Sequence, residues 1–272
     1  MKSLNLRKNW LYIPLIALTL FYLLPMYVML VTGFKSFAEI DLKTMWNLPQ
    51  GIAFDNYIEA YKQLAPSLKN SFMMVIPAAL ISSMLGSLNG FILAKWKFRG
   101  ADIIFPFILF GMFIPYQSII IPLVQFMNAA GFTGLPGLAL AHIIYGIPIT
   151  TLTFRNYYAS LPQELLEAAK IDGADMLGIY RHILLPISIP SFVVVLIWQF
   201  TSAWNDFLFA VILTGNTEWP ITVALNNMAG SQIISWNVQM AGSLLAALPT
   251  LLVYIFLGRY FLRGLMAGSL KG

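Results

Sequence analysis

Long apolar runs separated by short polar segments dominate the sequence. Each run is long enough to cross a hydrocarbon layer about 30 Å thick, which takes a helix of about 20 apolar residues. The pattern predicts an all-α integral membrane protein with six transmembrane helices, organised as one domain over residues 1–272. The expected spans cover approximately residues 10–33, 70–94, 103–127, 137–158, 187–212 and 241–263.

Prolines interrupt two of these runs. Pro25 is expected to kink the first span, which neighbouring helices can tolerate. The third run contains Pro106, Pro115 and Pro122, so it can also be read as two shorter helices. A broken helix at membrane depth requires backbone that faces protein or a water-filled cavity.

Composition agrees with a membrane location and excludes several kinds of chemistry. The chain is 59% hydrophobic and 10% charged, whereas soluble domains have about 25% charged residues. It contains no cysteine, which excludes disulfides and thiol catalysis, and His142 and His182 lack the spacing of metal ligands. The net charge of +5 calls for no nucleic-acid partner, because loop charges in membrane proteins account for an excess of this size.

The distribution of basic residues predicts the orientation. With six spans, twelve basic residues fall on one side: Lys2, Arg7, Lys8, Lys95, Lys97, Arg99, Arg155, Lys170, Arg181, Arg259, Arg263 and Lys271. The other side has only Lys35, Lys43, Lys62 and Lys69, all among acidic residues in the first loop. Basic loops stay in the cytoplasm, so both termini are expected there. The first apolar run lacks a cleavage site and is expected to remain as a span.

The segment 159–186 is the most structured part expected outside the membrane. Ser160 and Gln163 fit a capping box, and Pro162 suits a first helical turn. Gly173 stands where a helix would end with a left-handed residue. These signals predict two short helices joined by a sharp turn at the cytoplasmic surface.

Each of these helices is expected to have an apolar face. The first face comprises Leu161, Leu165, Ala168 and Ala169. The second comprises Met176, Ile179, Tyr180 and Ile183. Small residues beside a carboxylate suit insertion into a partner's cleft, and an amphipathic helix resting on lipid headgroups is the alternative. Acidic residues outnumber basic ones in this segment, and anionic lipid would repel them, which favours docking onto a protein.

Seven positions of this segment resemble the EAA motif of ABC importer permeases. They are Glu167, Ala168, Ala169, Gly173, Ile183, Leu185 and Pro186, at the spacing of the motif. The resemblance implies a single type-1 ABC transmembrane domain over 1–272, with a cytoplasmic coupling helix between spans four and five. It implies these ATPase-docking residues: Glu164, Glu167, Ala168, Ala169, Asp172, Gly173, Ile183, Leu185 and Pro186.

The likeness extends to the maltose-type carbohydrate importers, and within them to the smaller permease subunit. Asn56-Tyr57, Trp204-Asn205-Asp206-Phe207 and the ending from Arg259 to Gly272 resemble that subunit. The resemblance implies a second permease subunit, an ATPase dimer and an extracytoplasmic substrate-binding protein as partners, in a bacterial or archaeal plasma membrane. It also implies that 213–240 reaches into the binding protein and that 264–272 contacts the ATPase.

Few residues of the chain itself offer chemistry. No phosphate-binding loop motif occurs, so no cofactor is expected here, and ATP and magnesium belong on the partner ATPase. The Gly86 and Gly90 pair indicates close helix packing. Asp206 lies either at bilayer depth, as a functional acid, or at the external interface beside Trp204.

Neutral polar residues within the spans are candidates for a translocation path: Asn89, Gln117, Ser118, Gln199, Ser202 and Asn205. Most residues of this kind make helix–helix contacts instead. The expected function is therefore that of a permease that moves a carbohydrate, more specifically an oligosaccharide, by alternating access driven by a separate ATPase. A glycerol phosphate ester is the alternative cargo. A stand-alone secondary carrier is disfavoured, because such carriers show several buried ionisable residues and internal repeats.

Overall fold

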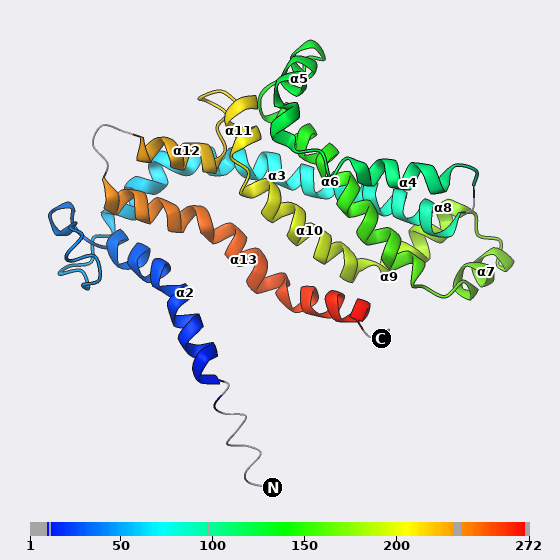
Figure 1. The fold of residues 1–272 in the computed structure, drawn as a ribbon, viewed down its shortest axis with the longest axis horizontal. Coiled ribbons are helices and arrows are strands. Elements are labelled where there is room, and N and C mark those ends of the chain that lie inside the picture. Colours follow the sequence, from blue (N-terminus) through cyan, green and yellow to red (C-terminus); the bar gives the residue numbers. More distant parts are fainter. Residues whose placement is uncertain (1–9, 11, 97, 231–234, 270–272) are drawn as a thin grey trace, which may run out of the picture. The chain divides into compact units, whose positions relative to one another are not determined.

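The computed structural model describes residue 10 and residues 12–96, 98–230 and 235–269, with side chains described as far as residue 260. Helices make up 79% of the structure, and the described residues contain no strand (Figure 1). The two termini and the end of the predicted tail contact at 264–272 lie outside the described residues. The all-α expectation is confirmed.

Four helices in the described part of the chain are long and apolar enough to cross a membrane. They are α2 (Tyr12–Gly33), α3 (Asp55–Lys95), α6 (Gly134–Ala159) and the apolar part, Trp236–Tyr260, of α13 (Trp236–Ser269). A fifth span results if Met176–Ile187 and Ile189–Trp204, which are bent by 74° where they join, count as one. The count of six spans therefore stays a prediction.

The third expected span is two helices, and the reading of 103–127 as one continuous helix is wrong. α4 (Ala101–Phe110) and α5 (Tyr116–Ala129) are separated by a break that ends at Pro115. A proline disfavours helical backbone in the residue before it, which explains a break at this position. Pro106 and Pro122 lie inside α4 and α5, and neither proline interrupts its helix.

Other boundaries also differ from the sequence pattern. α3 begins at Asp55 instead of near residue 70, so part of the expected first loop is helical. α10 (Ile189–Trp204) ends early, and α11 (Leu208–Leu213) follows after a break. The expected loop 213–240 contains the helix α12 (Ile221–Ala229). Hydropathy marks where a chain is apolar, but it does not mark where a helix continues beyond the apolar stretch.

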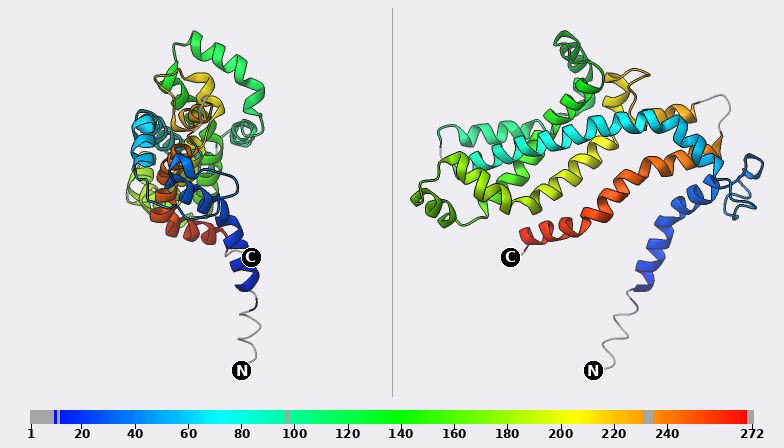
Figure 2. Two further views of the ribbon diagram at one scale, coloured as in Figure 1. Left: turned by 90° about the vertical axis from the view of Figure 1, so that its left-hand side faces the viewer. Right: turned by 180° about the vertical axis from the view of Figure 1, so that it is seen from behind.

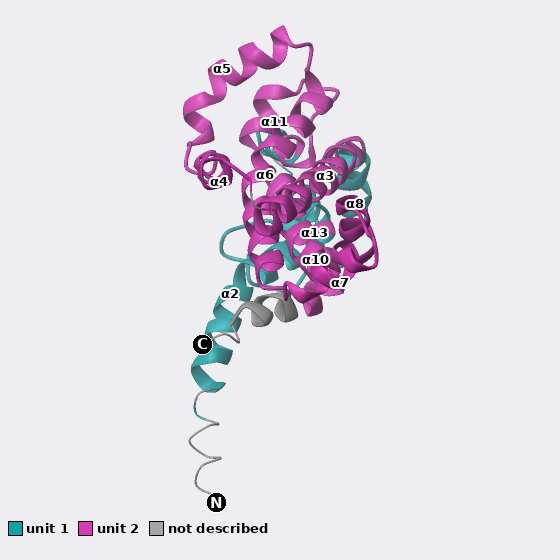
Figure 3. Ribbon diagram, turned by 90° about the vertical axis from the view of Figure 1, so that its right-hand side faces the viewer, with its two compact units in different colours: residues 1–65, 225–248 teal, residues 66–224, 249–272 magenta. Residues whose placement is uncertain are grey.

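The structure divides into two compact units (Figure 3). The first comprises residues 1–65 and 225–248, and the second comprises residues 66–224 and 249–272. Both boundaries in long helices fall at a proline, Pro66 in α3 and Pro249 in α13.

A small core holds the first unit together. Ala60, Val238 and Ala241 are buried there, with Tyr57, Met228 and Leu245 packed around them. The buried Asn56 amide donates to the carbonyls of Gly33 (2.9 Å) and Lys35 (2.8 Å) and accepts from the Asn237 amide (2.8 Å). These bonds join the end of α2 to the starts of α3 and α13.

The loop after α2 is organised around Glu39, in the short helix η1 (Phe37–Glu39). Its carboxylate accepts hydrogen bonds from the Gln50 amide (2.8 Å) and from the Ser36 hydroxyl (2.7 Å) and amide (3.1 Å). The bond from Gln50, followed by those from Ser36, holds the pKa of Glu39 below its usual range.

In the second unit, α3, α6 and α10 run beside one another, as Figures 1 and 2 show. α3 and α6 approach closely: a Cβ atom at Gly86 would lie 2.1 Å from Thr150 Oγ1, and one at Gly90 would lie 2.6 Å from the Arg155 amide nitrogen. The predicted packing role of this glycine pair is confirmed. Arg155 also stacks on Phe105 of α4, with 4.1 Å between the guanidinium carbon and the ring centre.

Candidate docking segment and polar residues of the spans

The segment 159–186 starts where α6 ends, and this overturns the predicted capping box. Ser160 is the C-terminal cap of α6, and its hydroxyl donates to the Tyr157 carbonyl at 2.7 Å. The next helix, α7 (Glu164–Ile171), begins after Gln163 without a side-chain cap. Carbonyl groups at a helix end lack partners within the helix. The Ser160 hydroxyl therefore serves the helix before it.

Burial assigns the faces of α7, and it differs from the predicted apolar face. Leu166 and Ala169 are only 4% and 5% exposed, whereas Leu165 is 43% exposed and Ala168 is exposed as well. Ala169 therefore lies on the buried side of α7, away from Leu165 and Ala168, and the prediction that these residues share one face is wrong for Ala169. Within the motif triplet, Ala169 holds α7 on the protein, while Glu167 and Ala168 remain free to meet a partner.

Gly173 ends α7 as predicted. Its φ of 83° lies in the left-handed region. The Gly173 amide donates to Lys170 O (3.0 Å) and the Ala174 amide to Ala169 O (2.9 Å), the pair of bonds that defines a Schellman motif. A Cβ atom at Gly173 would meet nothing within 4 Å. Glycine is therefore required here by backbone conformation alone.

A second helical stretch leads from α7 to α10. It comprises α8 (Met176–Ile179), the π-helix η2 (Tyr180–Leu184) and α9 (Leu185–Ile187). Asp175 caps its start by accepting from the Gly178 amide at 2.8 Å. Ile179 and Leu184 are both buried, and their five-residue spacing matches the π-turn. The predicted face is confirmed for Ile179 and Tyr180, whereas Ile183 is only partly buried.

An apolar core beneath the segment ties it to three long helices. Phe91 of α3, Phe154 and Tyr158 of α6, and Val195 of α10 belong to this core. The Phe91 and Tyr180 rings stack with their centres 5.6 Å apart. Lys95, at the end of α3, donates to the Leu161 carbonyl at 2.7 Å. The segment is therefore held at the end of these helices (Figure 1).

The nine residues predicted to dock form two groups. The exposed ones are Glu164, Glu167, Ala168, Asp172, Gly173 and Pro186, whereas Ala169, Ile183 and Leu185 pack on the protein. Ile171 was absent from the prediction, yet it is 86% exposed at the end of α7. An exposed isoleucine beside acidic residues suits a partner's surface better than water. The sequence signal for this exposed position was an apolar residue, Ile171, at the end of the helix and two residues before Gly173.

The six predicted path residues do not converge. Gln199 donates to Ser82 Oγ (3.1 Å), and Asn89 donates to Thr151 Oγ1 (3.5 Å), so both connect helices. The other four, Gln117 and Ser118 of α5, Ser202 of α10, and Asn205 directly after α10, are exposed. Ser202 and Asn205 lie in line with the exposed Trp198 at helical spacing.

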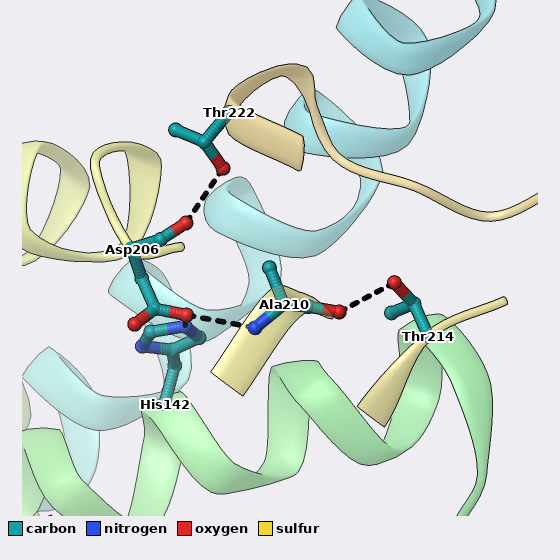
Figure 4. A network of polar contacts seen from close by, with 5 residues as sticks. All are labelled: His142, Asp206, Ala210, Thr214 and Thr222. Atoms are coloured by element: carbon teal, nitrogen blue, oxygen red, sulfur yellow. Dashed lines mark hydrogen bonds and ion pairs between the residues drawn. The ribbon is translucent and has the colours of Figure 1, made fainter. Parts of the chain in front are cut away.

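Asp206 pairs with a histidine that the sequence placed alone (Figure 4). The distance from His142 Nε2 to Asp206 Oδ2 is 3.5 Å. The same carboxylate oxygen accepts from the Ala210 amide at 3.0 Å, and the Asp206 carbonyl accepts from the Thr222 hydroxyl at 2.7 Å. Asp206 therefore holds the start of α11 against α6 and α12. Sequence separation hid this pairing, and no metal-ligand group accompanies it among the described residues.

Comparisons with known proteins agree with this arrangement. The family model described as the inner membrane component of binding-protein-dependent transport systems matches residues 83–266. A probable ABC transporter permease of Pyrococcus horikoshii is 46% identical, and the match covers 100% of both chains. The xylose/arabinose import permease protein XacI of Haloferax volcanii is 35% identical over 97% of this chain and 94% of its own length.

A solved structure shows the same fold. A chain of a bacterial ABC transporter involved in the import of the acidic polysaccharide alginate superposes with a TM-score of 0.78, at 22% identity, over 93% of this chain and 97% of that chain. The family match spans the docking segment, the closely packed α3 and α6 from residue 83 onward, and most of α13. This chain belongs to the family of inner membrane components of binding-protein-dependent transport systems, the permease subunits of ABC importers.

Proposed function

We propose that this permease imports a carbohydrate and that α7 is the surface through which a separate ATPase drives it. The exposed face of α7 carries this proposal. Glu164, Glu167, Ala168 and Ile171 are turned away from the protein, while Leu166 and Ala169 fasten the helix to the core. A helix that packs on the protein along one face and is exposed along the other can insert into the groove of a partner protein.

The charges of α7 indicate the chemistry of that groove. Glu164, Glu167 and Asp172 are exposed around the apolar Leu165 and Ile171. An apolar centre with a charged rim is the usual anatomy of a protein interface. The ATPase is therefore expected to present an apolar pocket bordered by Arg or Lys, which pair strongly with carboxylates.

An exposed line of side chains along α10 and its C-terminal cap supports a second permease subunit as a further partner. Trp198 is 58% exposed, and Ser202 and Asn205 continue its line. Exposed polar side chains at membrane depth are unfavourable against lipid, which offers them no hydrogen bonds. We place this line on the substrate pathway between the two permeases.

A carbohydrate is the cargo that these groups fit best. Hydroxyl and amide side chains match the hydrogen bonds of sugars, and the Haloferax relative is named for xylose and arabinose. An oligosaccharide remains the expected size class, delivered by an extracytoplasmic binding protein. In the orientation predicted from the basic residues, α7 and both termini face the cytoplasm and α11 faces outward.

Purification from native membranes tests the proposed assembly. A second permease and an ATPase dimer should accompany the chain, and recovery as an active lone protein would refute the importer. Reconstituted with the binding protein, the complex should import an oligosaccharide or a pentose in preference to glycerol 3-phosphate. Preference for glycerol 3-phosphate would overturn the carbohydrate assignment.

Charge reversal tests the docking surface. Glu167→Lys should weaken ATPase binding about tenfold or more, since it sets a like charge against the expected basic rim. Glu59→Lys, an exposed site on α3 in the other unit, is the matched control. Equal ATPase affinity for both variants would exclude docking through this face of α7.

A further inference from the structure

A chain of four buried hydroxyl groups lies beneath the docking segment. Tyr180 is 5% exposed, and Ser87, Tyr158 and Ser188 are each 0% exposed. The oxygen atoms follow one another at 3.0 Å from Tyr180 to Ser87, 2.7 Å from Ser87 to Tyr158 and 3.1 Å from Tyr158 to Ser188. Ser188 Oγ then donates to the Leu185 carbonyl at 2.9 Å.

The hydrogen bonds of this chain run in one direction. Tyr180 donates to Ser87, and Tyr158 donates its single proton to Ser188. Ser87 must therefore be the donor to Tyr158, because a hydroxyl carries only one proton. Every link is satisfied, and the last proton reaches a backbone carbonyl. A fully satisfied buried network fixes one arrangement of the groups that it joins.

Each member comes from a different element. Tyr180 lies in the π-helix η2, Ser87 in α3 and Tyr158 in α6. Ser188 occupies the joint at which Met176–Ile187 and Ile189–Trp204 meet at 74°. Since Ser188 also donates to Leu185, the chain of hydroxyl groups contacts the first arm of this bend at Tyr180 and Leu185 and its joint at Ser188. It connects the docking segment to three long helices through four side chains.

The surroundings show that packing alone does not require these hydroxyl groups. The ring of Phe91 stacks on Tyr180, and that of Phe154 stacks on Tyr158 with centres 5.9 Å apart. The remaining neighbours in this core are largely apolar. Phenylalanine and alanine would fill the same space without a polar group to satisfy. The polar chain therefore adds a defined geometry to a core that apolar side chains could fill.

We propose that this hydroxyl chain transmits movement of the ATPase-docking segment to α3, α6 and α10. The inference rests on the proposed docking of α7. Its four members are positioning residues, because each is buried and acts through the groups to which it is hydrogen-bonded. With the chain intact, a displacement of α7 and η2 moves the bend at Ser188 and the ends of α3 and α6 as one body. With the chain broken, the docking segment can move while the long helices lag behind.

The test uses the complete complex with its binding protein in proteoliposomes. The measured quantity is the number of ATP molecules hydrolysed per sugar imported. Tyr180→Phe and Ser188→Ala should each raise this ratio about fivefold, the lower range of allosteric coupling. Tyr158→Phe, which keeps the ring and removes the central link, should raise it at least as far.

A double substitution separates transmission from general loosening. Tyr180 and Ser188 are joined only through Ser87 and Tyr158 in this chain. Combining Tyr180→Phe with Ser188→Ala should therefore raise the ratio no further than the stronger single variant, because one break already disconnects the chain. Multiplied effects of the two substitutions would overturn the proposal.

Tyr157→Phe is the matched control. Tyr157 is the neighbour of Tyr158 on α6, and its hydroxyl donates to the Ile187 carbonyl outside the chain. This variant should keep the wild-type ratio. Two results would show that the hydroxyl groups have only a structural role. One is a rise in the ATP-per-sugar ratio of Tyr157→Phe equal to that of the chain variants. The other is a lowered thermal midpoint with an unchanged ratio in Tyr180→Phe. Failure of the wild-type complex to import sugar, or to bind the ATPase, would instead refute the proposed function.

Discussion

The left-handed turn at Gly173 allows the proposed docking surface of α7 to be tested with little change in shape. Gly173 has a φ of 83°, and a Cβ atom there would meet nothing within 4 Å. Alanine at this position adds no clash, so its whole cost is the backbone penalty of about 1–2 kcal/mol for an L-residue in the left-handed region. Asparagine tolerates that region far better.

This penalty should appear as lost affinity for the ATPase. If the free segment relaxes around alanine and must regain the turn to dock, 1–2 kcal/mol corresponds to roughly 5- to 30-fold weaker binding. Gly173→Asn should lose about threefold or less, since its backbone cost is a fraction of that. Surface plasmon resonance of the ATPase on nanodisc-held permease measures both.

Two comparisons decide this prediction. Gly51→Ala, in an exposed loop where a Cβ also meets nothing within 4 Å, should bind the ATPase like the wild type. Equal affinities for Gly173→Ala and Gly173→Asn would refute the reasoning, because the two differ mainly in their tolerance of the left-handed turn.

Three further predictions follow from contacts elsewhere. Leu166→Ala should destabilise the protein by about 2–5 kcal/mol in detergent unfolding, whereas Leu165→Ala should keep the thermal midpoint and weaken ATPase binding. Asp206→Ala should cost about 1–3 kcal/mol, since it leaves His142 and the start of α11 without their partner, and Asp206→Asn should cost less. The lowered pKa of Glu39 means that its hydrogen bonds stabilise the loop fully above the ordinary carboxyl pKa of about 4.3. That contribution is lost as pH falls through the lower pKa of the folded loop. The protection factors of the amides there, which correct for the intrinsic pH dependence of exchange, should therefore fall in acid, and Glu39→Gln should abolish that fall.

Several structural features could be predicted from single glycine and proline residues in the sequence. Gly173 predicted the end of α7, because glycine adopts the left-handed backbone conformation without strain. The pair Gly86 and Gly90 predicted close packing of this helix, because small residues let the backbones of two helices approach each other. Pro115 marked the break between α4 and α5, although the choice between one helix and two was still open. Each of these signals depends on a residue and its immediate neighbours.

The tertiary structure decided which side of each helix meets protein. α2 and α3 both contain a strongly apolar stretch of 18 residues, yet 11% of that stretch is buried in α2, against 50% in α3. Where nearly every position is apolar, periodicity cannot separate a face that packs on a helix from one that meets lipid or a partner. The exposed Ala168 and Ile171, the His142–Asp206 pair and the hydroxyl chain from Tyr180 to Ser188 depend on such packing. The sequence alone thus identified a membrane permease and predicted a docking segment, while packing between distant segments determined which residues of that segment are exposed.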